Sequence, residues 1–156
     1  MSKKANIITN KVIRDCMYKV DRKNYISNTM SNTAYEDRPL SIGYSATISA
    51  PHMHAHVLEE LVPILEKNHN NDKETNLSIL DVGCGSGYLT TCFGRLLDGK
   101  NVDGFSGKVY GIEYVPELVD MAKRNIQKED NDLFESDTIE VSRGNGWKGV
   151  SAKACY

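Results

Sequence analysis

The sequence predicts an α/β fold in which the strands of a parallel sheet alternate with helices in three layers. Two observations support this prediction. Short apolar runs with the length of buried strands are each followed by apolar residues at helical spacing. A glycine-rich turn joins the first run to its helix, as in folds that bind a ligand at the carboxyl edge of a parallel sheet.

The strands and helices of this core can be placed from the apolar pattern. The predicted strands cover residues 77–82, 108–113 and 138–142. The helix after the first strand has an inner face of Leu89, Cys92, Phe93, Leu96 and Leu97. The helix after the second strand begins at Pro116, and its inner face is Leu118, Val119, Ala122 and Ile126.

The part of the chain before the core is expected to be mainly helical. Apolar residues at helical spacing predict an amphipathic helix near the N-terminus (Val12, Ile13, Cys16, Met17 and Val20), and Pro51 opens another helix. Residues 68–73 are interpreted as a polar loop, and residues 98–107 as a flexible surface connection. We expect one domain, with a helical, substrate-side region at 1–50 and a cofactor-binding core at 51–156.

Composition narrows the class of protein. With 156 residues, 40% hydrophobic and 26% charged, the chain is an ordinary globular domain, and its net charge of −2 gives no attraction for nucleic acid. The basic residues near the N-terminus, including Lys3 and Lys4, are interpreted as a solvated helix face. No apolar signal segment or membrane-spanning run is seen, so a cytoplasmic location is expected.

The cysteines and histidines do not indicate a metal site. Cys16, Cys84, Cys92 and Cys155 form no C-x-x-C pair, so we expect reduced thiols. His52 and His56 share a helix face, but His54 points elsewhere, and no carboxylate completes a ligand set.

The glycine turn has the spacing D-x-G-x-G-x-G, formed by Asp81, Gly83, Gly85 and Gly87. A dinucleotide site requires G-x-G-x-x-G around a pyrophosphate, which this spacing does not provide. The pattern resembles the first motif of the Rossmann-like S-adenosylmethionine methyltransferases. The resemblance implies that Asp81, Gly83 and Gly85 contact that cofactor, with the glycine backbone against its methionine portion.

The ends of the next two predicted strands supply the remaining contacts expected for a nucleoside. Glu113 ends the second strand, where a carboxylate can accept both hydroxyls of a ribose. Asn145 and Gly146 follow the third strand, where the adenine is expected to lie. Tyr88 and Trp147 are further candidates to flank the ligand.

The segment before the glycine turn indicates a family more specifically than the glycine turn does. The string at residues 41–55, SIGYSATISAPHMHA, closely resembles the signature of protein-L-isoaspartate O-methyltransferases, and the similarity continues through residues 81–83 and 107–113. It implies that Ala46, Thr47, Ile48, Ser49 and His54 contact S-adenosylmethionine and that Ser49 is catalytic. The implied activity is methylation of the free carboxylate of isoaspartyl residues in damaged proteins, which repairs them, and S-adenosylhomocysteine is the product.

Elementary chemistry agrees with such a site. The isoaspartyl carboxylate is ionised at neutral pH, so it needs no general base. The protein has to align it for in-line displacement and exclude water. A hydroxyl at the positive end of a helix can orient a carboxylate, which suits Ser49 just before the helix opened by Pro51. Spacing alone also allows Ser49 to be a helix cap without a catalytic role.

Two departures from the family pattern are visible. The family has Gly-Asp-Gly where this chain has Gly144-Asn145-Gly146, which replaces a charged acceptor with a weaker neutral one. The chain also ends at Tyr156, where the family continues into a fourth strand, so we expect a C-terminally truncated member that lacks the C-terminal strands. The resemblance implies a monomer for the full-length enzyme, whereas an unpaired sheet edge favours self-association of the short chain.

Two alternatives remain from the sequence. One is a methyltransferase for another substrate class, such as a small molecule or RNA, although no basic surface studded with aromatic residues supports it. The other is a non-catalytic module that binds the cofactor or a protein without transferring a methyl group. Binding of S-adenosylhomocysteine by the purified chain is the simplest test of the second alternative.

Overall fold

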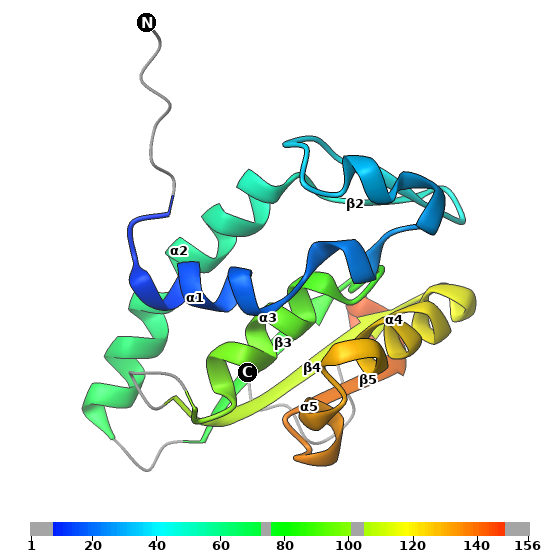
Figure 1. Cartoon of the computed structure of the whole chain (residues 1–156). Helices are drawn as coiled ribbons and strands as arrows, with labels where there is room; N and C mark the ends of the chain where they lie inside the picture. Colours follow the sequence, from blue (N-terminus) through cyan, green and yellow to red (C-terminus); the bar gives the residue numbers. More distant parts are fainter. Residues whose placement is uncertain (1–7, 73–75, 101–104, 149–156) are drawn as a thin grey trace, which may run out of the picture.

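A parallel sheet forms the centre of the molecule. The structure is a computed structural model that describes residues 8–72, 76–100 and 105–148. Within them, β3 (Leu77–Val82), β4 (Gly107–Glu113) and β5 (Ile139–Arg143) form a three-stranded parallel sheet in the order β3-β4-β5. Leu77 pairs with Gly107, and Val109 pairs with Ile139. The predicted strands and their order of alternation with helices are confirmed (Figure 1).

The helices that follow the strands cover one face of this sheet. Gly94 in α3 (Tyr88–Leu97) lies against Ile139 of β5, and Ala122 in α4 (Pro116–Glu129) lies against the glycine turn. α5 (Asp132–Glu135) is a single turn before β5. The predicted inner faces are confirmed except at Leu89, which is half-buried. The other predicted residues are buried: Cys92, Phe93, Leu96, Leu97, Leu118, Val119, Ala122 and Ile126.

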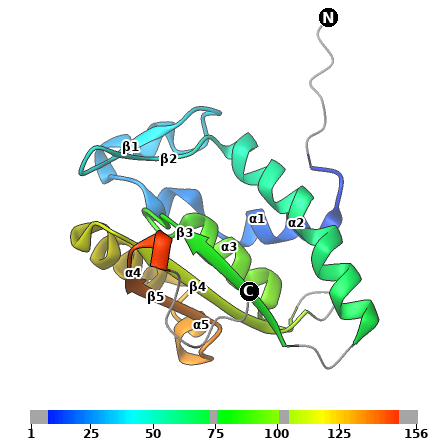
Figure 2. The same cartoon turned by 180° about the vertical axis from the view of Figure 1, so that it is seen from behind.

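The N-terminal helices pack onto this layer. α1 (Lys11–Lys19) packs against α3 and α2 (Pro51–Asn71), and it buries Ile13 and Cys16. Figures 1 and 2 show α1 beside α3 and the long α2 running along the same side of the molecule. Pro51 opens α2 as predicted. Within the described residues, no helix is long and apolar enough to cross a membrane.

Residues 20–50 are less helical than predicted. The 3-10 turns η1 (Arg22–Tyr25) and η2 (Asn28–Thr33) lead into an antiparallel hairpin of β1 (Leu40–Gly43) and β2 (Ala46–Ile48). The hairpin turns through Tyr44 and Ser45 with φ of +52° and +56°. Hairpin turns with positive φ usually contain Asn-Gly or Asp-Gly, and neither pair is present here, so the hairpin was not predicted.

The described parts of the two predicted connections, residues 68–72, 98–100 and 105–107, make defined contacts. α2 continues through residues 68–71 and ends at its C-cap Asp72, because His69 packs edge-to-face on the buried ring of Phe105, with ring centres 5.5 Å apart. Phe105 anchors the second connection, where Gly99 N–H donates to the Phe105 carbonyl over 2.9 Å. Residues 101–104 of that connection lie outside the described residues, as do Lys3, Lys4 and Cys155.

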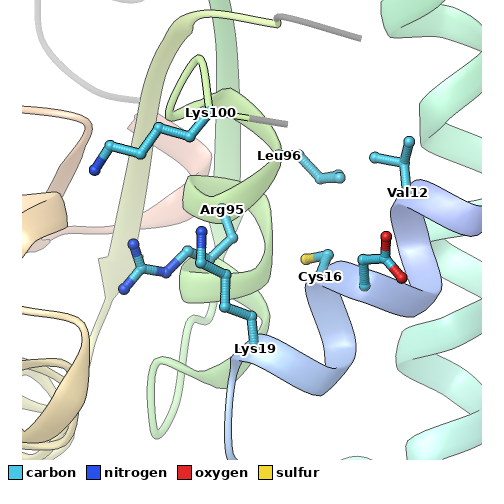
Figure 3. Close-up of a pocket in the computed structure, with 7 residues that line it drawn as sticks. Val12, Cys16, Lys19, Arg95, Leu96 and Lys100 are labelled. Carbon is cyan, nitrogen blue, oxygen red and sulfur yellow. The ribbon is translucent and has the colours of Figure 1, made fainter. Parts of the chain in front are cut away.

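A buried polar cluster fastens the helical layer together. Arg95 donates to Asp130 over 2.6 Å and to Asp132 over 2.7 Å, and the Tyr25 hydroxyl donates to Asp130 over 2.8 Å. Arg95 also lines a cavity of about 160 Å³ between α1 and α3, with Cys16, Lys19 and Lys100 around it (Figure 3). Because the Arg95 guanidinium already donates to Asp130 and Asp132, we interpret this cavity as a gap between packed helices and not as a ligand site.

Candidate functional site

The turn after β3 approaches other backbone closely. Gly83, Gly85 and Gly87 have φ of +78°, +55° and +88°, which favour glycine. A Cβ at Gly87 would lie 3.1 Å from the Cβ of Ala122, so this position also lacks space for a side chain. The Ile112 carbonyl accepts hydrogen bonds from Gly83 and Cys84 N–H over 2.8 and 3.1 Å, which fastens the turn to β4. The result is a rigid loop at the start of α3.

Glu113 lies beside this loop at the end of β4. Its Oε2 accepts a hydrogen bond from Gly85 N–H over 3.1 Å, and its Oε1 accepts from Tyr114 and Val115 N–H over 2.7 and 3.1 Å. The residue is 9% exposed. Backbone donors therefore fix the position of this carboxylate, while the predicted contact with ribose hydroxyls stays a prediction.

Two further ionisable groups lie at the base of the loop. The Asp81 carboxylate accepts a hydrogen bond from the Thr90 hydroxyl over 2.6 Å, and burial raises the pKa of Asp81. Burial, with the nearby charges of Asp81 and Glu113, raises the pKa of Cys84 to about 12. The Cys84 thiol is therefore protonated at neutral pH and is no nucleophile.

The hairpin and α2 close the loop into a cavity of about 150 Å³. Seven predicted site residues line it together: Thr47, Ile48, Ser49, His54, Asp81, Gly83 and Gly85. Tyr88 also lines it. The cavity thus joins residues on both sides of the expected boundary at residue 50, although they are separated by about thirty positions in the sequence.

His54 is the most unusual group in this lining. It is 6% exposed, and its ring centre lies 4.8 Å from that of Tyr88. Its Nδ1 has no hydrogen-bond partner among the residues that the structure describes. Burial, aided by the charge of Arg22, lowers the pKa of His54 to about 4, so the imidazole is neutral at physiological pH. A buried polar atom without a partner in a cavity wall is suited to a polar ligand.

The remaining predicted residues lie outside this lining. Ala46 begins β2 and is half-buried, and Glu113 contacts the lining through Gly85. Asn145 is exposed, and its Oδ1 accepts a hydrogen bond from Trp147 N–H over 3.0 Å. A Cβ at Gly146 would collide with Cγ1 of Val82, so the loop after β5 lies against the end of β3. Trp147 is 99% exposed.

Sequence reasoning missed part of the cavity wall. Met53 and Val57 line it from α2, and both are largely exposed. Their spacing of four residues places them on one helix face, beside the buried face of His54 and Leu58. This second apolar face of α2 is the sequence feature that could have predicted Met53 and Val57 in the cavity wall.

A solved structure with the same fold defines the class of protein. The chain matches the beta-aspartate methyltransferase (PCMT) from Plasmodium falciparum, solved in complex with S-adenosyl-L-homocysteine, with a TM-score of 0.75 and 31% identity. The match covers 93% of this chain and 60% of that one. Together with the glycine loop at the carboxyl edge of the parallel sheet, this match defines a Rossmann-like methyltransferase fold.

Sequence comparisons identify the family within this class. The model of the protein-L-isoaspartate(D-aspartate) O-methyltransferase (PCMT) family matches residues 1–156, and the chain belongs to that family. It is 38% identical over 142 residues to the protein-L-isoaspartate O-methyltransferase of Caenorhabditis elegans, covering 91% of this chain and 55% of the relative. It is 37% identical to the protein-L-isoaspartate O-methyltransferase 2 of Arabidopsis thaliana, and this match covers 99% of this chain and 45% of the relative. The chain thus spans about half the length of the curated relatives it matches.

Proposed function

We propose that this protein is a protein-L-isoaspartate O-methyltransferase that uses S-adenosylmethionine. The observation that carries the proposal is the single cavity in which Ser49 and its neighbours in β2 meet the glycine loop. Family membership supports the same reaction, since the relatives are named for it. The substrate class is a polypeptide that contains an isoaspartyl residue.

The residues present fit the cofactor. Gly83 leaves open space above the loop, because a Cβ at this position would meet nothing within 4 Å. The unpartnered Nδ1 of His54 offers a free hydrogen-bonding atom, and Glu113 supplies a fixed carboxylate next to the loop. We propose that these residues hold the cofactor with Ala46, Thr47, Ile48 and Asp81, and that Asn145 and Gly146 border the adenine. When bound, S-adenosylmethionine supplies an electrophilic methyl group.

Ser49 is the residue that we propose orients the substrate. It follows β2 directly and precedes Ala50, the N-cap of α2, and it is exposed. A hydroxyl at this position can donate a hydrogen bond to one carboxylate oxygen, while the positive end of the 21-residue α2 attracts the negative charge. No base is required, because the substrate carboxylate is already ionised.

The test is methyl transfer from labelled S-adenosylmethionine by the purified protein. One peptide contains isoaspartate, and its twin contains normal aspartate at the same position. We expect label on the isoaspartyl peptide only. Label on both peptides, or on neither while S-adenosylhomocysteine binds, would contradict the proposal. The second result would support a non-catalytic cofactor-binding module instead.

We also propose that the protein acts in the cytoplasm. Cys16, Cys84 and Cys92 are free thiols, as is usual in a reducing compartment. Immunoblotting of the native protein in cell fractions tests the location, and recovery in a secreted or organellar fraction would contradict it.

A further inference from the structure

A second and larger cavity lies on the other side of the hairpin. It is a groove of about 540 Å³ between residues 26–30, the strand β1 and the helix α4. Figure 2 shows β1 and α4 on the same side of the molecule, with the hairpin above the helix. The volume is in the range of binding sites for small ligands and short peptide segments. None of the predicted site residues lines this groove.

The groove has a positive charge with no partner. Arg124 is the one charged side chain in its lining, and it is exposed. No hydrogen bond or ion pair of Arg124 is found among residues 8–72, 76–100 and 105–148. The neighbouring Lys128 is already engaged, since its Nζ donates to the Asn24 carbonyl over 2.6 Å and to Asn125 Oδ1 over 3.0 Å. An anionic group entering the groove would therefore meet a free guanidinium.

One wall of the groove is a strand with a free edge. β1 pairs with β2 along one side, and within the described part of the chain no other strand pairs with it. The Gly43 N–H donates to the Ser41 hydroxyl over 3.4 Å. Ser41, Ile42 and Gly43 of this strand line the groove. An extended polypeptide can pair with such an edge through main-chain hydrogen bonds, which do not depend on its side chains. Met30 and Met121 on the other walls are flexible apolar side chains that adapt to different residues.

The groove is connected to the candidate functional site by two contacts. The Asn125 side-chain amide donates to the Ser86 carbonyl in the glycine loop over 3.1 Å. Ile42 Cδ1 lies 3.5 Å from the position of a Cβ at Gly85. One layer of side chains therefore separates the groove from the cavity that contains Ser49. A polypeptide could reach both around the hairpin.

We infer that this groove binds the polypeptide that flanks the isoaspartyl residue, with its main chain along β1 and an acidic side chain on Arg124. The inference rests on the proposed function and adds a substrate preference to it. Main-chain pairing suits an enzyme that must accept damage in many sequence contexts. Arg124 then favours substrates with aspartate or glutamate near the damaged residue, because a guanidinium and a carboxylate form a charge-assisted, bidentate pair.

The experiment measures binding and turnover separately. Fluorescein-labelled isoaspartyl hexapeptides that differ only by glutamate or glutamine at one flanking position are titrated with the full chain, with S-adenosylhomocysteine present. We expect the best glutamate peptide to bind about fivefold or more tightly than its glutamine twin, in line with one charge-assisted pair. Arg124→Gln should remove this difference and leave the affinity for the glutamine peptide unchanged. Lys123→Gln is the matched control, since Lys123 is exposed on the same helix but does not line the groove.

The outcomes separate this inference from the proposed function. Equal affinity of the unmodified protein for both peptides at every position would overturn the role of Arg124, as would an equal loss for both peptides in Arg124→Gln. A preference that Arg124→Gln removes, without methyl transfer to either peptide, would support the groove and contradict the proposed function. Methyl transfer to the isoaspartyl peptides without a preference for glutamate would support the proposed function and contradict the role of the groove.

Discussion

The backbone N–H of Gly85 donates a hydrogen bond to the carboxylate of Glu113 over 3.1 Å. This contact joins the loop after β3 to the end of β4, so the two predicted halves of a nucleoside site hold each other in place. Both oxygens of Glu113 are positioned by backbone donors. The geometry of the carboxylate is thus fixed before any ligand arrives.

Glu113→Gln should weaken binding of S-adenosylhomocysteine. The substitution keeps the shape but removes the charge, and loss of a charge-assisted hydrogen bond costs about 2 kcal/mol, or roughly 30-fold in affinity. Isothermal titration calorimetry measures the effect. Glu117→Gln, in the exposed first turn of α4, is the control and should bind normally. Equal affinities for the two variants would exclude Glu113 from the cofactor site.

Ser49→Ala should separate cofactor binding from methyl transfer. We expect kcat/KM for the isoaspartyl peptide to fall about 100-fold, while the affinity for S-adenosylhomocysteine changes little, because the hydroxyl is proposed to contact the substrate carboxylate. Ser78→Ala, at an exposed position of β3, is the control. Turnover by Ser49→Ala at the rate of Ser78→Ala would leave Ser49 as a residue next to a helix end with no catalytic role.

His54 should make stability depend on pH. Its pKa is lowered from 6.5 to about 4 in the folded protein, so between these values protons bind mainly to the unfolded chain. Stability is therefore lost as the pH falls from about 6.5 to about 4, and at pH 5 the loss from this group is about 2 kcal/mol. Urea unfolding at pH 7.5 and pH 5 measures it.

The variant His54→Phe isolates this contribution, since it keeps a ring against Tyr88 but cannot be protonated. Its stability should decrease less between the two pH values than that of the unmodified protein. The control is His56→Gln, an exposed position on the same helix, which should retain the full decrease. The same decrease in all three proteins would show that His54 is not the responsible group.

Asn145→Asp should tighten cofactor binding. Asn145 is exposed in the loop after β5, and a carboxylate there is a stronger acceptor than the amide, by about 1 kcal/mol or roughly fivefold in affinity. The single tryptophan, Trp147, is two residues away and 99% exposed, so its fluorescence can report the titration. Asn70→Asp at an exposed position of α2 is the control. An unchanged affinity in Asn145→Asp would remove this position from the adenine contact.

The purified chain of residues 1–156 should self-associate as its concentration rises. β3 is an edge strand of the sheet in the part of the chain that the structure describes. Beside it, Leu80 and the half-exposed Ile64 line a largely apolar groove. Light scattering coupled to size exclusion measures the mass. Ile64→Lys should weaken association and the exposed Tyr18→Lys should not; a monomer at all concentrations would contradict the prediction.

The core was predictable because its signals are local and repeated. The strands that end in Val82 and Glu113 are apolar runs, and the helices after them place an apolar residue every three or four positions. The hairpin was not predictable, because its strands are only four and three residues long and its turn contains Tyr44 and Ser45. The hairpin buries Ile42 and Ile48 in the core, and this long-range packing has no local signal in the sequence.

Residue type and position predicted much of the candidate site, but not its environment. The family resemblance led to Ser49 and the glycine spacing led to Gly85, and both residues line one cavity. The missing partner of His54 Nδ1 depends on what packs around it, which no local pattern encodes. The sequence also gives no signal for the role of Arg124, since exposed arginines are common on helices. Only the structure shows that it lines a groove with β1.

The hydrogen bond between Tyr25 and Asp130 spans 105 positions of the chain. It encloses the hairpin, the glycine loop and Glu113 within one long loop of polypeptide. Contacts at such separations form late in folding, because closing a long loop costs entropy before the contact stabilises it. The contact between Tyr25 and Asp130 should therefore form later than the local contacts of the glycine loop. During synthesis, a ribosome-bound chain that ends before Asp130 should have the glycine loop but lack this closure.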